Sequence, residues 1–252
     1  MSQWLVLTIA MAAVCGVVLT ITVLKERRVG KDDDPNETPD VIEYLTMMVG
    51  VVYAIVLGLA IAGVWETKSS AEDTVRTEAQ ALHEVSERVR AWPAPVRDRI
   101  RTDVNSYVGD VVHKEWPVMA DRGELTQHSA DLLDRVRADV IDYHPRDDYE
   151  RESYQPVVDQ VGVANGARSA RADAVEPTLP GVVWFGLIAG GVISIGVMFT
   201  LQIRRSGREL LMAGVFSALI AFLLFLVWDF DAPFSRGLAT AADPFFALFP
   251  HV

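Results

Sequence analysis

Apolar and polar positions divide this chain into long uncharged stretches and one long charged segment. Four stretches without Asp, Glu, Lys or Arg lie at residues 4–24, 44–65, 179–203 and 210–228. A helix of about 20 residues crosses the roughly 30 Å hydrocarbon core of a bilayer. Because a helix pairs its own backbone polar groups, it is the conformation expected in lipid. The pattern predicts an integral membrane protein with four transmembrane helices.

The charged segment, residues 66–178, is predicted to form a helical extramembrane domain. Apolar side chains recur every three to four positions within residues 75–89, 96–111 and 125–140, which is typical of amphipathic helices. The helices are expected to break at Trp92-Pro93, Trp116-Pro117 and His144-Pro145, because proline disfavours helix in the preceding residue. The predicted fold class is therefore all-α, with two membrane helices on each side of a helical insert.

The ends of the insert are predicted to be continuous with the membrane helices. No glycine or proline lies between residues 64 and 92, so the second span is expected to continue as one long helix beyond the bilayer. The last helix of the insert is expected to run into the third span in the same way. Residues 151–174 have a thin apolar pattern and mixed charges, which predicts a surface-exposed or partner-contacting helix.

Charge and cysteine content narrow the class of protein. The formal net charge is −11, and residues 66–176 hold 23 acidic and 15 basic side chains. A nucleic-acid partner is not expected, because binding to phosphates requires Lys and Arg. The single cysteine, Cys15, excludes an intrachain disulfide framework.

The first apolar stretch could also be read as a cleaved signal peptide. A secretory signal has a basic start and a shorter apolar core. Here the first three residues carry no basic side chain, and Lys25, Arg27 and Arg28 follow the stretch instead. A retained membrane helix is therefore expected.

Flanking charges predict the orientation in the cell membrane. The two short links between spans carry the basic residues Lys25, Arg27, Arg28, Lys31, Arg204, Arg205 and Arg208. Basic residues near span ends favour the cytoplasmic side, and tryptophans favour membrane boundaries. The opposite boundary holds Trp4, Trp65, Trp184 and Trp228. A multi-pass protein with the insert and both termini outside the cytoplasm is expected.

Small residues recur every four positions in the spans. They are Ala54, Gly58 and Ala62 in the second span, and Gly186, Gly190 and Ser194 in the third. Such spacing favours close packing of membrane helices, although a glycine hinge for gating is the alternative. No ionisable residue lies well inside a span, which argues against a proton-coupled transporter or pump.

Candidate chemistry is sparse along the chain. The histidines of the insert lack the close spacing of zinc ligands. The acidic runs at residues 32–34 and 147–150 lack the alternating ligands and glycine of an EF-hand. Neither a phosphate-binding loop nor a nucleophile motif occurs. We therefore predict no enzyme, no catalytic residue, no metal site and no cofactor; an intramembrane enzyme is the least favoured class.

Several short motifs together resemble one family. The run from Val52 to Gly58, the pair Val64-Trp65 and the pair Glu78-Ala79 resemble the start of the bestrophin-like family of uncharacterised membrane proteins. Tyr107 with Glu115-Trp116-Pro117 resembles its middle signature, and Asp231-Ala232-Pro233-Phe234 its last one. In this chain Arg236 separates Phe234-Ser235 from Gly237, which departs from the family pattern. The signature residues are Trp65, Glu78, Tyr107, Glu115, Trp116, Pro117, Asp231, Pro233 and Phe234.

The resemblance implies a channel-like architecture. Bestrophins, to which the family is remotely similar, are pentameric anion channels with four spans per subunit. Their second span lines the pore, and the candidate constriction residues here are Met47, Val51 and Ile55. Their helical domain is cytosolic, which conflicts with the orientation expected from the charges of this chain.

Two hypotheses of function follow. The leading one is a homo-oligomeric membrane protein that passes anions. The alternative is a non-conducting sensor or scaffold in the bilayer, whose insert binds a protein or envelope partner. In both, residues 229–252 are expected to form an amphipathic tail at the membrane interface, with Asp231 fixing the turn that leads into it.

Overall fold

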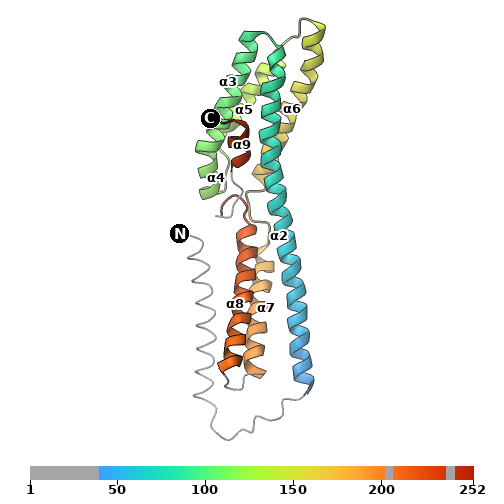
Figure 1. Cartoon of the computed structure of the whole chain (residues 1–252), viewed down its shortest axis with the longest axis vertical. Coiled ribbons are helices and arrows are strands. Elements are labelled where there is room, and N and C mark those ends of the chain that lie inside the picture. The colour runs from blue at the N-terminus through green and yellow to red at the C-terminus, as the bar shows by residue number, and fades with distance from the viewer. Residues whose placement is uncertain (1–39, 202–206, 237–241) are drawn as a thin grey trace. The chain divides into compact units, whose positions relative to one another are not determined.

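The computed structural model describes residues 40–201, 207–236 and 242–252, and all regular structure in these ranges is helical. This confirms the all-α prediction for the described residues, whereas the first predicted span, residues 4–24, lies outside them. The helices are α2 (Asp40–Arg88), η1 (Val89–Ala91), α3 (Ala94–Asp110), η2 (Val111–Glu115), α4 (Trp116–Arg122), α5 (Gln127–Ile141), α6 (Asp148–Asp173), α7 (Gly181–Leu201), α8 (Gly207–Phe230) and α9 (Asp243–Leu248) (Figure 1).

The chain divides into two compact units. We call residues 1–65 and 179–231 the membrane unit, and residues 66–178 and 232–252 the insert unit. The helix α2 begins in the first and ends in the second, so the predicted continuation of the second span is confirmed.

The membrane unit contains three described helices that are long and apolar enough to cross a bilayer. They lie at Tyr44–Ala91, Gly181–Met198 and Leu211–Phe230 and match the second, third and fourth predicted spans. The small core of this unit joins α2, α7 and α8 through Tyr53, Leu57, Val64, Leu187, Ile220, Val227 and Phe230. Most other large apolar side chains of these helices are exposed, as expected for a surface that faces hydrocarbon.

The insert does not run into the third span as a continuous helix. The helix α6 ends at Asp173, and α7 begins only at Gly181. Pro177 and Pro180 lie in this connection. Each removes a backbone donor and disfavours helix in the residue before it, so this prediction was wrong.

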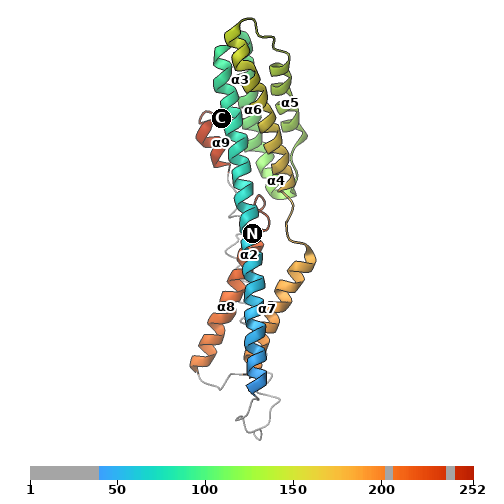
Figure 2. The same ribbon diagram turned by 90° about the vertical axis from the view of Figure 1, so that its right-hand side faces the viewer.

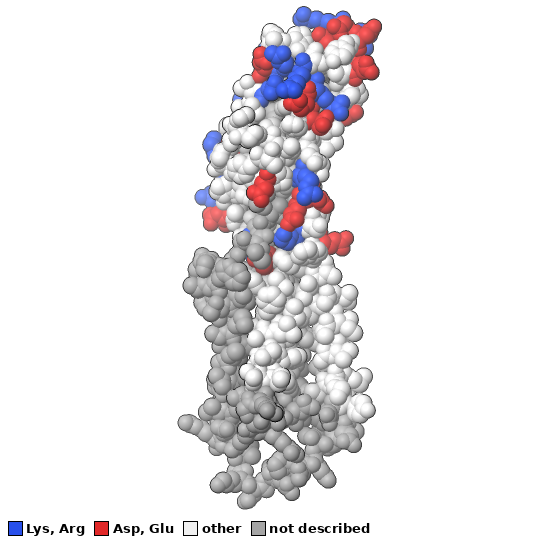
Figure 3. Space-filling view, viewed as in Figure 1, with Lys and Arg blue, Asp and Glu red and all other residues white. Residues whose placement is uncertain are grey.

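The insert unit is a bundle of long helices with one continuous core. In Figures 1 and 2 the upper part of α2 lies with α3, α5 and α6 along a common direction. Residues from all four helices are fully buried, among them Leu82, Ile100, Val136 and Val157. Charged side chains gather on the surface of this unit (Figure 3), as the amphipathic pattern predicts.

The three helix breaks predicted at prolines of the insert are not all found in the structure. Helices stop before Pro93 and Pro145, as predicted. At Trp116-Pro117 the chain instead stays helical, because η2 is a π-helix in which the Trp116 N–H donates to the carbonyl of Val111. Pro117 has no backbone N–H to donate, and the π-turn before it lets the chain pass this position without interrupting the helix. The predicted break is therefore replaced by one wide turn.

The helix α6 buries one face in the bundle and exposes the other. Val157, Val161 and Ala164 are buried, and so are Arg168 and Arg171. The expectation of a surface-exposed helix therefore holds for one face only, because two inward positions of the other face are arginines, which sequence patterns assign to the surface.

The C-terminal tail also packs into the insert unit. Phe234, Phe245 and Phe249 are buried in its core, and the Phe234 ring meets Trp116 edge-on at 5.9 Å between centroids. Phe246, by contrast, is 48 % exposed. The tail buries its apolar side against protein, which corrects the expectation of a tail at the membrane interface.

Candidate functional site

The most unusual feature of the insert unit is a buried group of four charged side chains. Glu78 on α2, Glu115 on η2, and Arg168 and Arg171 on α6 are all buried, and Tyr107 on α3 lies beside them. We call these five residues the charge cluster. Buried charges are rare unless they are paired, so the cluster is a candidate functional site.

Arg171 is the centre of the charge cluster. Its Nε donates to Glu78 Oε2 at 2.8 Å, and its Nη2 donates to Glu78 Oε1 at 3.1 Å and to Glu115 Oε1 at 2.9 Å. Its Nη1 lies 3.6 Å from Met119 Sδ, and the guanidinium carbon lies 5.7 Å from the centroid of the Trp116 ring. One arginine thus joins two carboxylates that are 37 positions apart in the chain.

Arg168 pairs with Glu115 in a bidentate arrangement. Its Nη1 and Nη2 donate to Glu115 Oε1 and Oε2 at 2.6 and 2.8 Å. Nη2 also donates to the carbonyl of Thr126 at 3.0 Å, and the Thr126 N–H donates to Glu115 Oε2 at 2.9 Å. Because Thr126 is the N-cap of α5, this pair also binds the residue that precedes the first turn of α5.

Local structure explains how these side chains meet. Arg168 and Arg171 are three residues apart on α6, which places them on one face of the helix. The π-turn at Val111–Glu115 directs Glu115 inward, and the neighbouring His113 and Lys114 stay exposed. The left-handed Gly123, with φ 70°, ends α4 and lets the chain return toward Thr126.

The electrostatics of the charge cluster stabilise its charged forms. Burial alone raises the pKa of the Glu115 carboxyl, but hydrogen bonds from Arg168 and the charges of both arginines outweigh it, so the pKa lies below its ordinary value. Burial and the Glu78 charge hold the pKa of the Tyr107 hydroxyl well above its ordinary value. Tyr107 therefore stays protonated and donates to Glu78 Oε1 at 2.5 Å.

The charge cluster links several elements of the insert unit to one another. Its two positive and two negative groups balance, and their hydrogen bonds connect α2, α3, η2, α5 and α6. Within the described ranges, no group of three or more His, Cys, Asp or Glu side chains could hold a metal ion. This arrangement favours a mechanical role.

Signature residues of the first and the middle motif converge on the charge cluster. Glu78, Tyr107 and Glu115 belong to it, the Arg171 guanidinium lies over the Trp116 ring, and Pro117 lies in the first turn of α4. The structure thus brings together motifs that are far apart in the sequence.

The remaining signature residues lie at other junctions. In the membrane unit, Asp231 accepts hydrogen bonds from the Leu179 N–H at 2.7 Å and from Trp184 Nε1 at 3.1 Å. Trp65 meets Phe230 edge-on at 5.3 Å. In the insert unit, Pro233 and Phe234 are buried. Asp231 thereby ties the start of α7 to the end of α8.

The candidate constriction residues lie on an open face of α2. Met47, Val51 and Ile55 are exposed by 61, 60 and 58 %. At about 100° per residue, Val51 and Ile55 point roughly opposite to the buried Tyr53. Their role in a pore stays a prediction.

The small residues of the spans have two different environments. A Cβ on Gly190 would lie 2.5 Å from the Tyr53 ring, so the Tyr53 side chain of α2 packs directly on the α7 backbone there, and Ser194 is buried on the same helix. By contrast, Ala54, Gly58, Ala62 and Gly186 are exposed in the described structure. Their packing role stays a prediction.

Sequence reasoning missed both arginines of the charge cluster. No motif and no periodic pattern in the sequence singles out Arg168 or Arg171. One signal was available: from residue 152 to residue 176 they are the only basic side chains, and they are three positions apart. Their partners, however, lie 53 to 93 positions away.

Comparison with known proteins identifies the family. The model of the bestrophin-like domain matches residues 12–245. No curated protein and no solved structure matches the chain. Because the domain match covers most of the chain, including the three described membrane spans and the charge cluster, the chain belongs to the bestrophin-like family.

Proposed function

We propose that this protein is the subunit of a homo-oligomeric channel that passes anions, with α2 lining a shared axis. The observation that carries the proposal is the division of α2 into two faces within the membrane unit. Tyr53, Leu57 and Val64 face α7 and α8, while Val51 and Ile55 face away from them. Membership of the bestrophin-like family supports the same architecture.

The contact between Tyr53 and α7 supports a defined rotation of α2. The Tyr53 hydroxyl donates to the Leu187 carbonyl at 3.0 Å, and its ring rests on Gly190. An anchored helix presents the same residues to the axis in every subunit. Met47, Val51 and Ile55 would then form apolar rings, and apolar constrictions are known to gate channels by dewetting.

Flux measurements on the purified protein in liposomes test this proposal. Val51→Asp is expected to change conductance strongly, and Ile55→Ala is expected to widen the constriction and raise anion flux. Val192→Ala is the matched control, since Val192 is equally exposed but lies on α7. A strictly monomeric protein that shows no ion flux would contradict the proposal.

The competing function is a non-conducting sensor or scaffold. The observation that favours it is the insert unit itself, which has its own core and an internal charge cluster. If the purified protein is oligomeric, shows no flux and co-purifies with a partner that binds the insert, this second function is favoured.

We further propose that the insert and both termini lie outside the cytoplasm, on the basis of the basic links. Labelling of Asp147→Cys and Lys31→Cys in intact cells by a membrane-impermeant reagent tests this. Labelling of Asp147→Cys alone is expected, and labelling of Lys31→Cys alone would reverse the orientation.

A further inference from the structure

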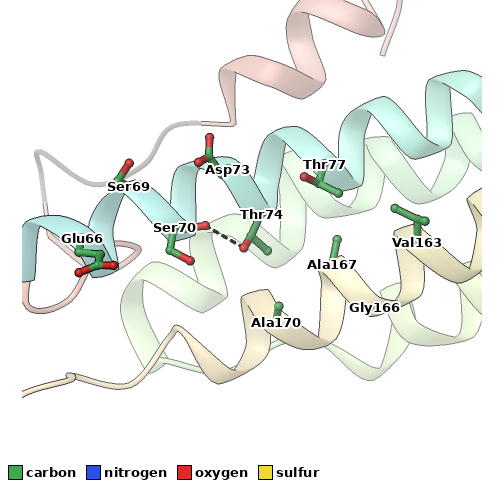
Figure 4. A pocket seen from close by; sticks show the side chains of 10 residues that line it. All are labelled: Glu66, Ser69, Ser70, Asp73, Thr74, Thr77, Val163, Gly166, Ala167 and Ala170. Carbon is green, nitrogen blue, oxygen red and sulfur yellow. Dashed lines mark hydrogen bonds between the residues drawn. The ribbon is translucent and has the colours of Figure 1, made fainter.

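A long groove runs between α2 and α6 in the insert unit. Its wider part has a volume of about 550 Å³ and is lined by Glu66, Ser69, Ser70, Asp73, Thr74, Thr77, Val163, Gly166, Ala167 and Ala170 (Figure 4). A second hollow of about 350 Å³ continues it as far as Glu84 and shares Thr77 and Val163. At about 1.5 Å per residue, the groove follows α2 for roughly 27 Å.

The lining of the groove leaves room for another helix. On the α6 side no lining residue of the wider part is larger than valine, and a Cβ on Gly166 would meet nothing within 4 Å. On the α2 side the lining consists of hydroxyl and carboxylate side chains, which Figure 4 shows along one helix. Small side chains let the backbone of a second helix approach closely, as ridges fit grooves in helix packing.

Charge distinguishes this face from the other side of the unit. From residue 152 to residue 176, the exposed charged side chains of α6 and its following turn are all acidic: Glu152, Asp159, Asp173 and Glu176. The lining of both parts of the groove contains no Lys or Arg. Two lining carboxylates pair with basic residues outside the lining, Asp73 with Arg76 and Glu84 with Arg88.

The helix α3 has complementary properties. It lies on the opposite side of α2 from α6 (Figure 1). Outside the charge cluster, α3 and η2 carry the basic residues Arg97, Arg99, Arg101 and Lys114 against the acidic residues Asp98, Asp103 and Asp110, the last of which pairs with Lys114. This helical segment therefore has a small basic excess. Its outward residues Thr102, Asn105 and Ser106 are small and exposed. Together α3 and η2 are helical from Ala94 to Glu115, which is long enough to fill the groove.

We propose that α3 of one subunit docks into the α2–α6 groove of the next, so that the insert units form a closed ring. The groove and its occupant are different surfaces of the same chain, and such head-to-tail contacts generate rings when the rotation closes. This inference rests on the homo-oligomer of the proposed function and identifies the surface through which it assembles.

The charge cluster predicts which residues face each other in this interface. Glu78 and Tyr107 are hydrogen-bonded within one subunit, so the preceding residues, Thr77 and Ser106, lie at one level along the bundle. Rotation about the ring axis keeps that level. Thr77 of one subunit should therefore lie near Ser106 of the next.

Disulfide cross-linking tests the interface. In a Cys15→Ser background, the double variant Thr77→Cys with Ser106→Cys is expected to give a ladder of dimers and higher multimers on mild oxidation in detergent. Each single variant should give no ladder. Thr77→Cys with Ala138→Cys is the matched control, because Ala138 is exposed on α5 and does not belong to the proposed interface.

A groove-filling substitution provides the second measurement. Gly166 is exposed, and a Cβ there would meet nothing within 4 Å in its own subunit. Gly166→Leu is therefore expected to fill the groove and abolish the ladder, whereas Ala172→Leu, exposed on α6 but outside the groove lining, should preserve it. An oligomeric particle without the ladder overturns this inference and leaves the proposed oligomer standing. A monomeric particle without the ladder overturns both.

Discussion

The two units of this protein differ in how much of their apolar side chains they bury. The described spans of the membrane unit leave most of their large apolar side chains exposed, and their shared core is small. The insert unit hides its apolar side chains in a continuous core, which also encloses the four mutually paired charged groups of the charge cluster. The difference follows from the solvent, because hydrocarbon accepts apolar side chains and water does not.

Different interactions specify how the helices pack in the two units. In the membrane unit, shape determines the contact between α2 and α7, since the Tyr53 ring lies against Gly190. In the insert unit, apolar helix faces alone would permit several arrangements, and the charge cluster adds partners that only one arrangement satisfies. We infer that close packing specifies the first unit and paired charges specify the second.

The largest expected effect comes from breaking the charge cluster. Arg171→Met leaves Glu78 buried without its main cation, and removal of one partner of a buried ion pair costs about 3–5 kcal/mol. Denaturant unfolding of the full chain in detergent, followed by far-ultraviolet circular dichroism, measures the loss. Arg76→Met, at an exposed pair, is the control and should stay within about 0.5 kcal/mol of the original; equal losses would refute a specifying role for the cluster.

The next effect separates protein burial from membrane burial in the tail. Phe245→Ala should cost about 3 kcal/mol, because the side chain is fully buried in the insert unit. Phe246→Ala should cost less than about 1 kcal/mol, since that neighbour is 48 % exposed. Thermal unfolding of both variants in detergent checks this difference. A similar small loss of stability for both variants would instead support a tail that lies at the membrane interface.

Two glycines on α7 test packing in the membrane unit. Gly190→Ala forces a Cβ to within 2.5 Å of the Tyr53 ring and should destabilise the unit by about 1–3 kcal/mol. Gly186→Ala meets nothing within 4 Å and should be neutral or slightly stabilising, because alanine favours helix. Resistance of the purified protein to heating in detergent compares them. Equal behaviour would contradict a shape-specified contact.

The smallest effect concerns pH and the insert unit alone. The pKa of Glu115 is depressed in the folded chain, so its contribution to stability is complete above the ordinary value of 4.5 and is lost as the pH falls through the lower folded pKa. Unfolding free energies measured between pH 7 and pH 3 should fall, and Glu115→Gln should give a shallower decline. An unchanged slope would show that other carboxylates dominate.

Sequence patterns predicted much of the architecture and part of the site. Apolar stretches located the second, third and fourth spans, and helical periodicity located α3 and α5. Glu78, Tyr107 and Glu115 were singled out by motif, yet nothing in their spacing predicted that they share one cluster. The π-turn before Trp116 was missed because proline rules describe α-helices and not the wider turn that accommodates Pro117.

The sequence by itself determined which segments suit lipid and which suit water. Hydrophobicity adds up along a local stretch, so residues 44–65 identify a span without knowledge of any partner. Only the tertiary structure decided that Arg168 and Arg171 face inward, that Phe245 packs against protein, and that α6 ends before the third span. Whether a charge can be buried depends on its partner, and the Glu78 partner of Arg171 lies 93 positions away in the chain.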